Sequence, residues 1–366
     1  MFRQYKLRDY RFSLIILVSA LSALGIMIIG SAQRSSQNRQ LYGLILGIGV
    51  MIFVSFIDYS WMLSFAWLMY FVGAGLLVAV LIFGENVNNA TRWIRIGIQF
   101  QPSDLVKIIL ILFFASYFSE REDQLNTFRT IIISLILLGI PLFLIYKEPD
   151  LSTAIVTAMS FCAIIFAAGL SFKIILGILM VFIPGVVIFF SVILRPGQTL
   201  LKEYQLNRIM AWLRPTEFAQ QAYQQQNSII AIGSGQLYGK GLNNNMVSSV
   251  KGGNFIAEPQ TDFIFAVAGE ELGFLGCCLI ILLEFLIALE CVRIGRRAKD
   301  LAGSLICCGM ASLIMLQSFV NISVATGLMP NTGITLPFVS YGVTSLITLC
   351  MGIGIVINVG LQSRKY

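Results

Sequence analysis

Long uninterrupted apolar runs dominate the pattern of this chain. A bilayer core about 30 Å thick requires roughly 17–25 apolar residues per helix. Ten runs of about this length predict transmembrane helices: Phe12–Gly30, Leu41–Ile57, Trp61–Phe83, Leu105–Phe118, Thr130–Tyr146, Leu151–Gly169, Ile174–Leu194, Gly273–Val292, Leu301–Ala325 and Tyr341–Gly360. The fourth run is short, so we expect its helix to begin earlier, near Pro102. The pattern predicts an all-α integral membrane protein with about ten transmembrane helices, in which residues 1–366 form a single polytopic membrane domain.

Two polar connections are longer than a simple turn. The longer one, at about 195–261 between the seventh and eighth runs, contains apolar side chains such as Tyr223, Ile229 and Phe255. Because loops beyond about 15 residues without structure of their own are uncommon, we expect it to fold onto the membrane surface. The other, Gly84–Asp104, places Trp93 among polar residues, which is typical of a segment in the membrane interface.

The composition agrees with lipid as the solvent and narrows the chemistry. The chain is 57% hydrophobic and 12% charged, whereas soluble domains average about 45–50% apolar and about 25% charged residues. It contains no histidine, which excludes a Ser-His-Asp triad and removes the commonest general base and metal ligand. The seven cysteines lie in or at the ends of apolar runs without a CxxC pair, so we expect neither a disulfide framework nor a metal site built by the protein alone.

The distribution of Lys and Arg predicts the orientation. An even number of spans places both termini on one side of the membrane. That side carries thirteen of the 25 Lys and Arg residues, and the short connections of the other side carry six. The long loop holds the rest, but long loops translocate largely regardless of charge. Because positive charge stays inside, both termini are predicted to be cytoplasmic and the loop at 195–261 external.

One carboxylate stands out as a candidate for chemistry. Asp262 follows the long polar loop and precedes Phe263 and Ile264, so it lies at the boundary of water and lipid. Partial desolvation raises the pKa of a carboxyl group and makes it a better general base. The alternative is that Asp262 only caps the N-terminus of the following helix, a common role of Asp. If the helix includes Asp262, Glu270 lies two turns further on the same face.

Lys107 lies near the start of the fourth span, after the QPSD turn at Gln101–Asp104. Two interpretations remain open for its ammonium group. It either snorkels toward water along its aliphatic stem or faces an anionic lipid headgroup.

Six blocks of sequence run in order along nearly the whole chain: TRWIRIGIQFQPSDLVK (Thr91–Lys107), EPDLSTA (Glu148–Ala154), NRIMAWLRP (Asn207–Pro215), IAIGSGQLYGKGL (Ile230–Leu242), TDFIFAVAGEELGFLG (Thr261–Gly276) and TGLMPNTGITLPFVSYGVTSL (Thr326–Leu346). Together they resemble the SEDS (shape, elongation, division, sporulation) family, the RodA/FtsW type of peptidoglycan glycosyltransferase, and the third block leans toward a RodA-like protein. The chain departs from the usual family pattern at Asp104 (usually Glu), Glu148 (Gln), Ser152 (Gly), Gln260 (His), Val343 (Gly) and across Asn243–Asn254.

The resemblance implies a peptidoglycan polymerase at the outer face of the bacterial cytoplasmic (inner) membrane. It implies transfer of lipid-linked disaccharide units (lipid II) with inversion and undecaprenyl pyrophosphate as the leaving group. Asp262 is then the general base for the acceptor hydroxyl. The resemblance also implies that other residues of the same blocks bind the substrate. These are the cations Arg92, Lys107, Arg208 and Lys240, the aromatic residue Trp93 and the carboxylate Glu270. A divalent cation such as magnesium is an alternative source of positive charge at the pyrophosphate.

The partners implied are lipid II, the growing lipid-linked glycan, membrane lipid and a class B penicillin-binding transpeptidase, and no nucleic acid. Two other functions stay open on the sequence alone. One is a lipid II flippase, a transporter that moves the substrate without forming a bond. The other is a non-catalytic scaffold for the transpeptidase. Whether purified protein lengthens glycan from lipid II separates the three.

Overall fold

The structure is a computed structural model that describes residues 10–87, 90–96, 98–193, 203–243 and 255–362. Each of the ten predicted runs is largely helical in its described residues, with ends that differ from the helix ends by one or two residues at several places. The helices that contain them are α1 (Phe12–Ala32), α2 (Arg34–Ser55), α3 (Tyr59–Ser64) with α4 (Ala66–Phe83), α5 (Pro102–Ser119), α6 (Phe128–Lys147), α7 (Leu151–Ala167), α8 (Phe172–Ile193), α11 (Ile264–Gly295), α12 (Leu301–Ala325) and α13 (Val343–Leu361). As expected, α5 begins at Pro102, where proline costs no helical hydrogen bond.

The prediction of an all-α integral membrane protein is confirmed. Within the described residues, eight helices have at least 18 residues and are apolar enough to cross a membrane. α7 has 17 residues and α8 has 22. The third run is divided at Phe65, between α3 and α4, and a short 3₁₀ helix, Glu122–Gln124, follows α5.

α5 lies at the centre of the bundle, packed against α4, α7, α12 and α13. Fifteen of its 18 residues are buried. The outer helices instead expose large apolar side chains, among them Ile16, Phe53, Phe71 and Phe83. Such surfaces are unfavourable in water but match the hydrocarbon of a bilayer. The molecule is therefore a multi-pass membrane protein.

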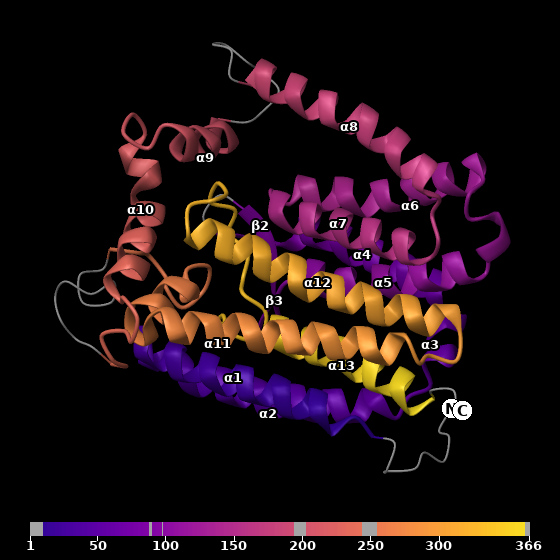
Figure 1. The fold of residues 1–366 in the computed structure, drawn as a ribbon, viewed down its shortest axis with the longest axis horizontal. Coiled ribbons are helices and arrows are strands. Elements are labelled where there is room, and N and C mark those ends of the chain that lie inside the picture. Colours follow the sequence, from indigo (N-terminus) through magenta and orange to yellow (C-terminus); the bar gives the residue numbers. More distant parts are fainter. Residues whose placement is uncertain (1–9, 88–89, 97, 194–202, 244–254, 363–366) are drawn as a thin grey trace.

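The two ends of the bundle are different. At one end the Tyr10 hydroxyl hydrogen-bonds to Ser55 Oγ at 2.8 Å, and Tyr59 N donates to Asn358 Oδ1 at 2.9 Å. The start of α1 and the end of α13 therefore lie together, as an even number of spans requires. The opposite end, which we call the loop end, consists of residues 84–87, 90–96, 98–101, 148–150, 203–243, 255–263 and 326–342 and carries α9 and α10 (Figure 1).

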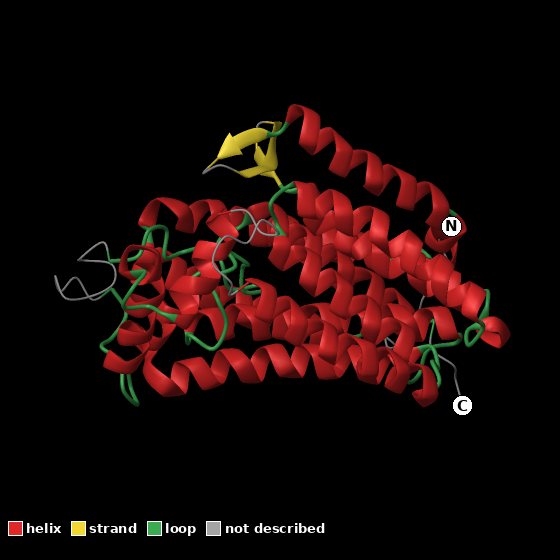
Figure 2. Ribbon diagram, turned by 90° about the horizontal axis from the view of Figure 1, so that it is seen from above, coloured by secondary structure: helices red, strands yellow, loops and turns green. Residues whose placement is uncertain are grey.

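A small antiparallel sheet forms where the sequence predicted an interfacial segment. Its strands are β1 (Glu85–Val87), β2 (Ala90–Ile96) and β3 (Ile98–Phe100), in the order β1-β2-β3. Figure 2 shows them as a compact group beside the helices. The structure thus adds strands to an otherwise helical protein, and whether the sheet lies in the interface stays a prediction.

The described parts of the long loop, 203–243 and 255–261, are folded, as predicted, and their position on the membrane surface stays a prediction. The loop contains α9 (Glu203–Leu213) and α10 (Ala219–Ser234). Trp212 Nε1 donates to Gly327 O at 2.9 Å, and Ser228 Oγ donates to Ala325 O at 2.8 Å. Gln225 Nε2 donates to the backbone oxygens of residues 324 and 329, at 2.8 and 2.7 Å. Both helices are therefore attached to the C-terminal end of α12.

α11 is broken at Gly273, where φ is 67°. The break leaves backbone groups without helical partners, and the chain at 236–241 supplies them. The amides of Lys240 and Gly241 donate to the carbonyls of Glu270 and Glu271 at 2.9 and 3.0 Å. A Cβ atom at Gly273 would lie 2.3 Å from the backbone nitrogen of residue 239. Only glycine fits so close an approach at positive φ.

Candidate active site

The chain just before α11 is held by three hydrogen bonds to its backbone. The carbonyl oxygens of residues 260, 261 and 262 accept from Tyr341 N at 2.9 Å, Ser340 Oγ at 2.7 Å and Asn321 Nδ2 at 2.8 Å. These donors come from α12 and from the segment before α13. The backbone of Asp262 is therefore fixed, while its side chain is not needed for the attachment.

The Asp262 side chain does not cap α11. The helix begins at Ile264, the preceding position is Phe263, and no side chain accepts from the first turn. The capping alternative is therefore wrong. The expected shared helical face with Glu270 is also wrong, because Asp262 precedes the helix. The carboxylate is half-buried, and it makes no hydrogen bond within the described part of the chain.

Four charged groups of the described residues act electrostatically on this carboxylate. Burial raises the pKa of the Asp262 carboxyl from 3.8 to about 6; Arg92 lowers it, Asp150 raises it, Arg208 lowers it and Glu258 raises it. A carboxyl with this pKa is mostly ionised at neutral pH, yet it is a stronger base than an exposed Asp. The prediction of a desolvated, basic carboxylate agrees with this environment.

The 331–335 segment runs beside the Asp262 carboxylate. A Cβ atom at Gly333 would lie 3.3 Å from Asp262 Oδ2, and φ there is 72°, so glycine is favoured on both counts. Ser152 Oγ from α7 donates to the backbone oxygen of residue 332 at 2.6 Å. Gln317 Nε2 from α12 donates to that of residue 335 at 3.0 Å. Two helices thus hold this segment against the carboxylate.

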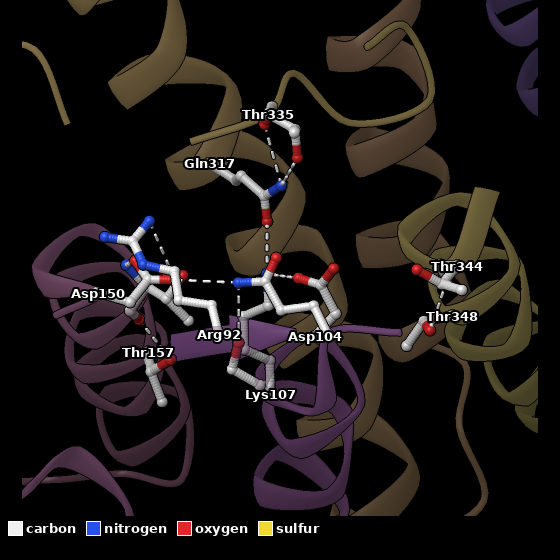
Figure 3. Close-up of polar contacts among 12 residues, drawn as sticks. Arg92, Asp104, Lys107, Asp150, Thr157, Gln317, Thr335, Thr344 and Thr348 are labelled. Atoms are coloured by element: carbon white, nitrogen blue, oxygen red, sulfur yellow. Dashed lines mark hydrogen bonds and ion pairs between the residues drawn. The ribbon is translucent and has the colours of Figure 1, made fainter. Parts of the chain in front are cut away.

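Arg92 extends from β2 to the turn between α6 and α7. Its Nε donates to Glu148 O at 3.3 Å, a terminal nitrogen donates to Pro149 O, and Nη1 lies 4.0 Å from Asp150 Oδ2. Asp150 itself caps α7 by accepting from Thr153 N at 3.1 Å. Figure 3 shows Arg92 and Asp150 side by side. Arg92 therefore fixes the turn that brings Asp150 near Asp262.

Glu148 is fully buried in this turn. Neither of its carboxyl oxygens has a hydrogen-bond partner among the described residues. Burial raises the pKa of Glu148 to about 8, Asp150 adds to the shift and Arg92 opposes it. At neutral pH the side chain is therefore mostly protonated and uncharged.

Lys107 lies inside the bundle, with 4% of its side chain exposed. Its Nζ is 2.8 Å from Asp104 Oδ1, whose side chain is 13% exposed, and it donates to Gln317 Oε1 at 3.0 Å. Figure 3 shows the ammonium group between these two partners. Snorkelling toward water is contradicted, because an ion pair within the bundle holds the ammonium group away from the surface. Contact with an anionic lipid headgroup stays a prediction.

The other predicted site residues do not all lie beside Asp262. Arg208, on α9, is exposed and acts on Asp262 through its charge. Lys240 Nζ lies 2.8 Å from Glu270 Oε1, so these two meet at the break in α11 and not at Asp262. Trp93 follows Arg92 on β2, and successive side chains of a strand point to opposite faces. Trp93 is therefore not directed with Arg92 toward the 148–150 turn.

No group of three or more Cys, Asp or Glu side chains that could hold a metal ion occurs in the described ranges.

Comparison with known proteins identifies the family. The model of the FtsW/RodA/SpoVE family, described as cell cycle protein, matches residues 6–365. Stage V sporulation protein E of Bacillus subtilis is 35% identical over 331 residues, which cover 89% of this chain and 87% of the relative. A probable peptidoglycan glycosyltransferase FtsW of Trichlorobacter lovleyi is 33% identical over 378 residues, covering 98% and 94%. The chain belongs to this family.

Solved structures agree with the assignment. The chain matches a structure described as structural coordination of polymerization and crosslinking by a peptidoglycan synthase complex, with a TM-score of 0.80, 28% identity and coverage of 96% and 97%. It also matches the rod shape determining protein RodA of Thermus thermophilus, with a TM-score of 0.71, 26% identity and 98% coverage of both chains. The RodA-like lean of the sequence is consistent with these matches.

The structure shows the contacts of three residues at which the chain departs from the family pattern. Glu148 stands where the family usually has Gln, and a protonated Glu is a close, uncharged substitute for that amide. Asp104, in place of Glu, still reaches Lys107 at 2.8 Å. The backbone oxygen of Gln260 accepts from Tyr341 N, so the side chain at this position is not required for the attachment. Within the unusual segment Asn243–Asn254, residues 244–254 lie outside the described residues.

Three residues that approach the site were missed by reasoning from the sequence. Asp150 lies in a block that was noted only for its resemblance. Gln317 and Asn321 bind the segments beside Asp262, and Asn321 Nδ2 also donates to Ile334 O at 2.7 Å. A signal for the last two was present, because amides four residues apart in an apolar run share one helical face.

Proposed function

We propose that this protein is a peptidoglycan glycosyltransferase that polymerises glycan strands from lipid II. The observation that carries the proposal is the Asp262 carboxylate: it is half-buried, has a raised pKa, and is influenced by the charges of Arg92 and Arg208. Membership of the FtsW/RodA/SpoVE family supports it, since a relative is named a probable peptidoglycan glycosyltransferase. The whole chain forms one polytopic membrane domain in this proposal.

The reaction requires one base and no general acid. The acceptor hydroxyl attacks the anomeric carbon of the donor, and the hydroxyl proton passes to the Asp262 carboxylate. The carbon–oxygen bond to pyrophosphate breaks, and its electron pair leaves with undecaprenyl pyrophosphate. Because this leaving group is a weak base, a second carboxylate like that of glycosidases is unnecessary. A single displacement converts an α-linked donor to a β-linked product.

Positive charge near Asp262 stabilises the departing pyrophosphate. Among the described residues, Arg92 and Arg208 are the cations whose charge reaches the Asp262 carboxyl. Arg92 faces the phosphates, while Arg208 acts on the carboxylate from α9. Lys107 is buried with Asp104 and Gln317 and contributes through its field and by holding the 331–335 segment. Trp93 shelters the site or stacks on a sugar, and Lys240 with Glu270 positions the segment that leads to Asp262.

The loop end faces the outside of the cytoplasmic membrane in this proposal, and both termini are cytoplasmic. Cysteine labelling tests the orientation with two exposed positions, Thr216 in the long loop and Arg297 after α11. In a background without the native cysteines, an impermeant reagent should label Thr216→Cys in intact cells and leave Arg297→Cys unlabelled. The reverse pattern would refute the orientation.

The protein works beside a class B penicillin-binding transpeptidase in this proposal. The similarity to a structure of a peptidoglycan synthase complex that coordinates polymerization and crosslinking supports such a partner. Co-purification with the transpeptidase and faster polymerisation on adding it are expected. An unchanged rate with the partner bound would remove the regulatory part of the proposal.

Purified protein supplied with lipid II tests the function itself. The proposal expects glycan strands of many disaccharides, analysed by gel electrophoresis after labelling of the lipid II. A flippase instead transfers lipid II across vesicle membranes without forming polymer, and a scaffold does neither. Absence of polymer from wild-type protein, both alone and with its transpeptidase, would reject the proposed function.

A further inference from the structure

A polar cleft of about 260 Å³ opens at the loop end between α9, α10 and the 326–342 segment. Its lining consists of four amides, one guanidinium group and one methyl group, from Asn207, Gln221, Gln225, Asn331, Arg208 and Ala211. A side-chain amide both donates and accepts hydrogen bonds. Such a lining suits a neutral ligand that presents donors and acceptors together, whereas a pyrophosphate would favour a cluster of cations.

The walls of the cleft are fixed. Gln225 uses its amide nitrogen to hold the backbone at residues 324 and 329, and Trp212 ties α9 to residue 327. The side-chain amides of Asn207, Gln221 and Asn331 have no hydrogen bond within the described residues. Three uncommitted amides thus line a preformed surface, and preorganisation lowers the cost of binding.

The 331–335 segment connects this cleft with the Asp262 carboxylate and with the buried Lys107. Asn331 lines the cleft, and Gly333, two residues later, lies against the Asp262 carboxylate. At residue 335 the same segment is bound by Gln317, which also accepts from Lys107. Within five residues the chain therefore passes from the amides, past the base, to the cationic side.

We propose that this cleft binds the sugar of the acceptor substrate, an N-acetylated hexose disaccharide. The inference rests on the proposed function, because transfer between two substrates requires a site on either side of the base. Hydroxyl and acetamido groups pair with amides as both donors and acceptors. The pyrophosphate of the donor lies on the other side, where Arg92 and Lys107 supply the charge.

A soluble disaccharide of N-acetylglucosamine and N-acetylmuramic acid, with the lactyl carboxyl group amidated so that the molecule is neutral, is the probe for this cleft, because it has the attacking hydroxyl but no leaving group. Its binding to the full-length purified protein should weaken about 2- to 12-fold in Gln221→Leu, and again in Asn207→Leu, as expected for loss of a neutral hydrogen bond. Gln226→Leu is the matched control, since it replaces an exposed amide of α10 outside the cleft. Asp262→Asn should bind the probe as tightly as wild type.

Farnesyl pyrophosphate, which carries the leaving group without a sugar, serves as the second probe. Gln221→Leu and Asn207→Leu should bind it as wild type does. Unchanged affinity for the disaccharide in both variants, or lost affinity for farnesyl pyrophosphate instead, would overturn the inference. Polymerisation of lipid II is measured in parallel: its absence in wild type would reject the proposed function, while disaccharide binding still decides whether the cleft holds sugar.

Discussion

The ion pair beneath the site gives the sharpest prediction about stability. Lys107 and Asp104 lie three residues apart, 2.8 Å from atom to atom, with side chains 4% and 13% exposed. Removing one partner of a buried pair leaves an uncompensated charge and costs about 3–5 kcal/mol. We therefore expect Lys107→Met to destabilise the protein by about this amount and Asp104→Asn by somewhat less, because Gln317 still accepts from the ammonium group.

The double variant separates a buried pair from two independent residues. Asp104→Asn with Lys107→Met leaves no charge behind, so its cost should fall below the sum of the single costs by about 0.5–3 kcal/mol. Reversible unfolding in mixed micelles of detergent and dodecyl sulfate measures the free energy of unfolding of each variant. Arg214 and Glu217 form the matched control, also three residues apart, at 3.3 Å but with side chains 59% and 58% exposed. An exposed pair contributes about 0–1 kcal/mol, so its removal should have little effect.

Removing the charge of Lys107 should also lower the rate of polymerisation. Without the Lys107 charge, the transition state in which pyrophosphate departs is less stabilised. Because Lys107 acts through its field and not by direct contact, the loss of rate should stay below the roughly 10- to 150-fold of a charge-assisted contact. Lys107→Met should thus slow turnover more than it weakens lipid II binding. Two results together would refute the reasoning: equally small losses of stability in the Lys107 and Arg214 variants, and wild-type turnover in both.

Three further predictions concern charge around the site. Glu148→Gln should stabilise the protein by up to about 4–5 kcal/mol at pH 8 and by little at pH 4. The reason is that a carboxyl with a folded pKa of about 8 makes the free energy of unfolding fall as pH rises above its unfolded pKa; equal gains at both pH values would contradict this. The polymerisation rate of wild type should fall as pH drops through about 6, as Asp262 takes up a proton, and a flat rate from pH 7 to 5 would argue against a titrating base. Lys240→Met should lower the polymerisation rate without changing the pH at which the rate falls, because Lys240 pairs with Glu270. A change in that pH would indicate that the charge of Lys240 acts on Asp262.

The spans were readable from the sequence for a simple physical reason. Lipid requires about twenty apolar residues per crossing, and this demand leaves a local pattern that needs no tertiary information. The long loop was predicted to fold from its apolar side chains, and α9 and α10 do pack against the end of α12. The small sheet was not predicted, because its strands are only three to seven residues long.

The site was predictable only in part, because its geometry depends on residues far apart in the chain. Asp262 was found from its position at a polar–apolar boundary. Its role as a cap was rejected only by the start of α11 at Ile264, and its attachment through Asn321 is a tertiary contact. The place of Lys107 near a helix end predicts that it reaches the surface, but its burial depends on α12, which supplies Gln317.

The substitution Asp262→Asn tests the central claim most directly. Asn keeps the size of the side chain, and the backbone oxygen that accepts from Asn321 is unaffected, so fold and lipid II binding should be retained. Polymerisation of pure lipid II by the purified variant should fall by at least about 100-fold, since a positioned base contributes about 10²–10⁴ in rate. An Asp262→Asn protein that still builds long glycan strands at the wild-type rate would contradict the mechanism.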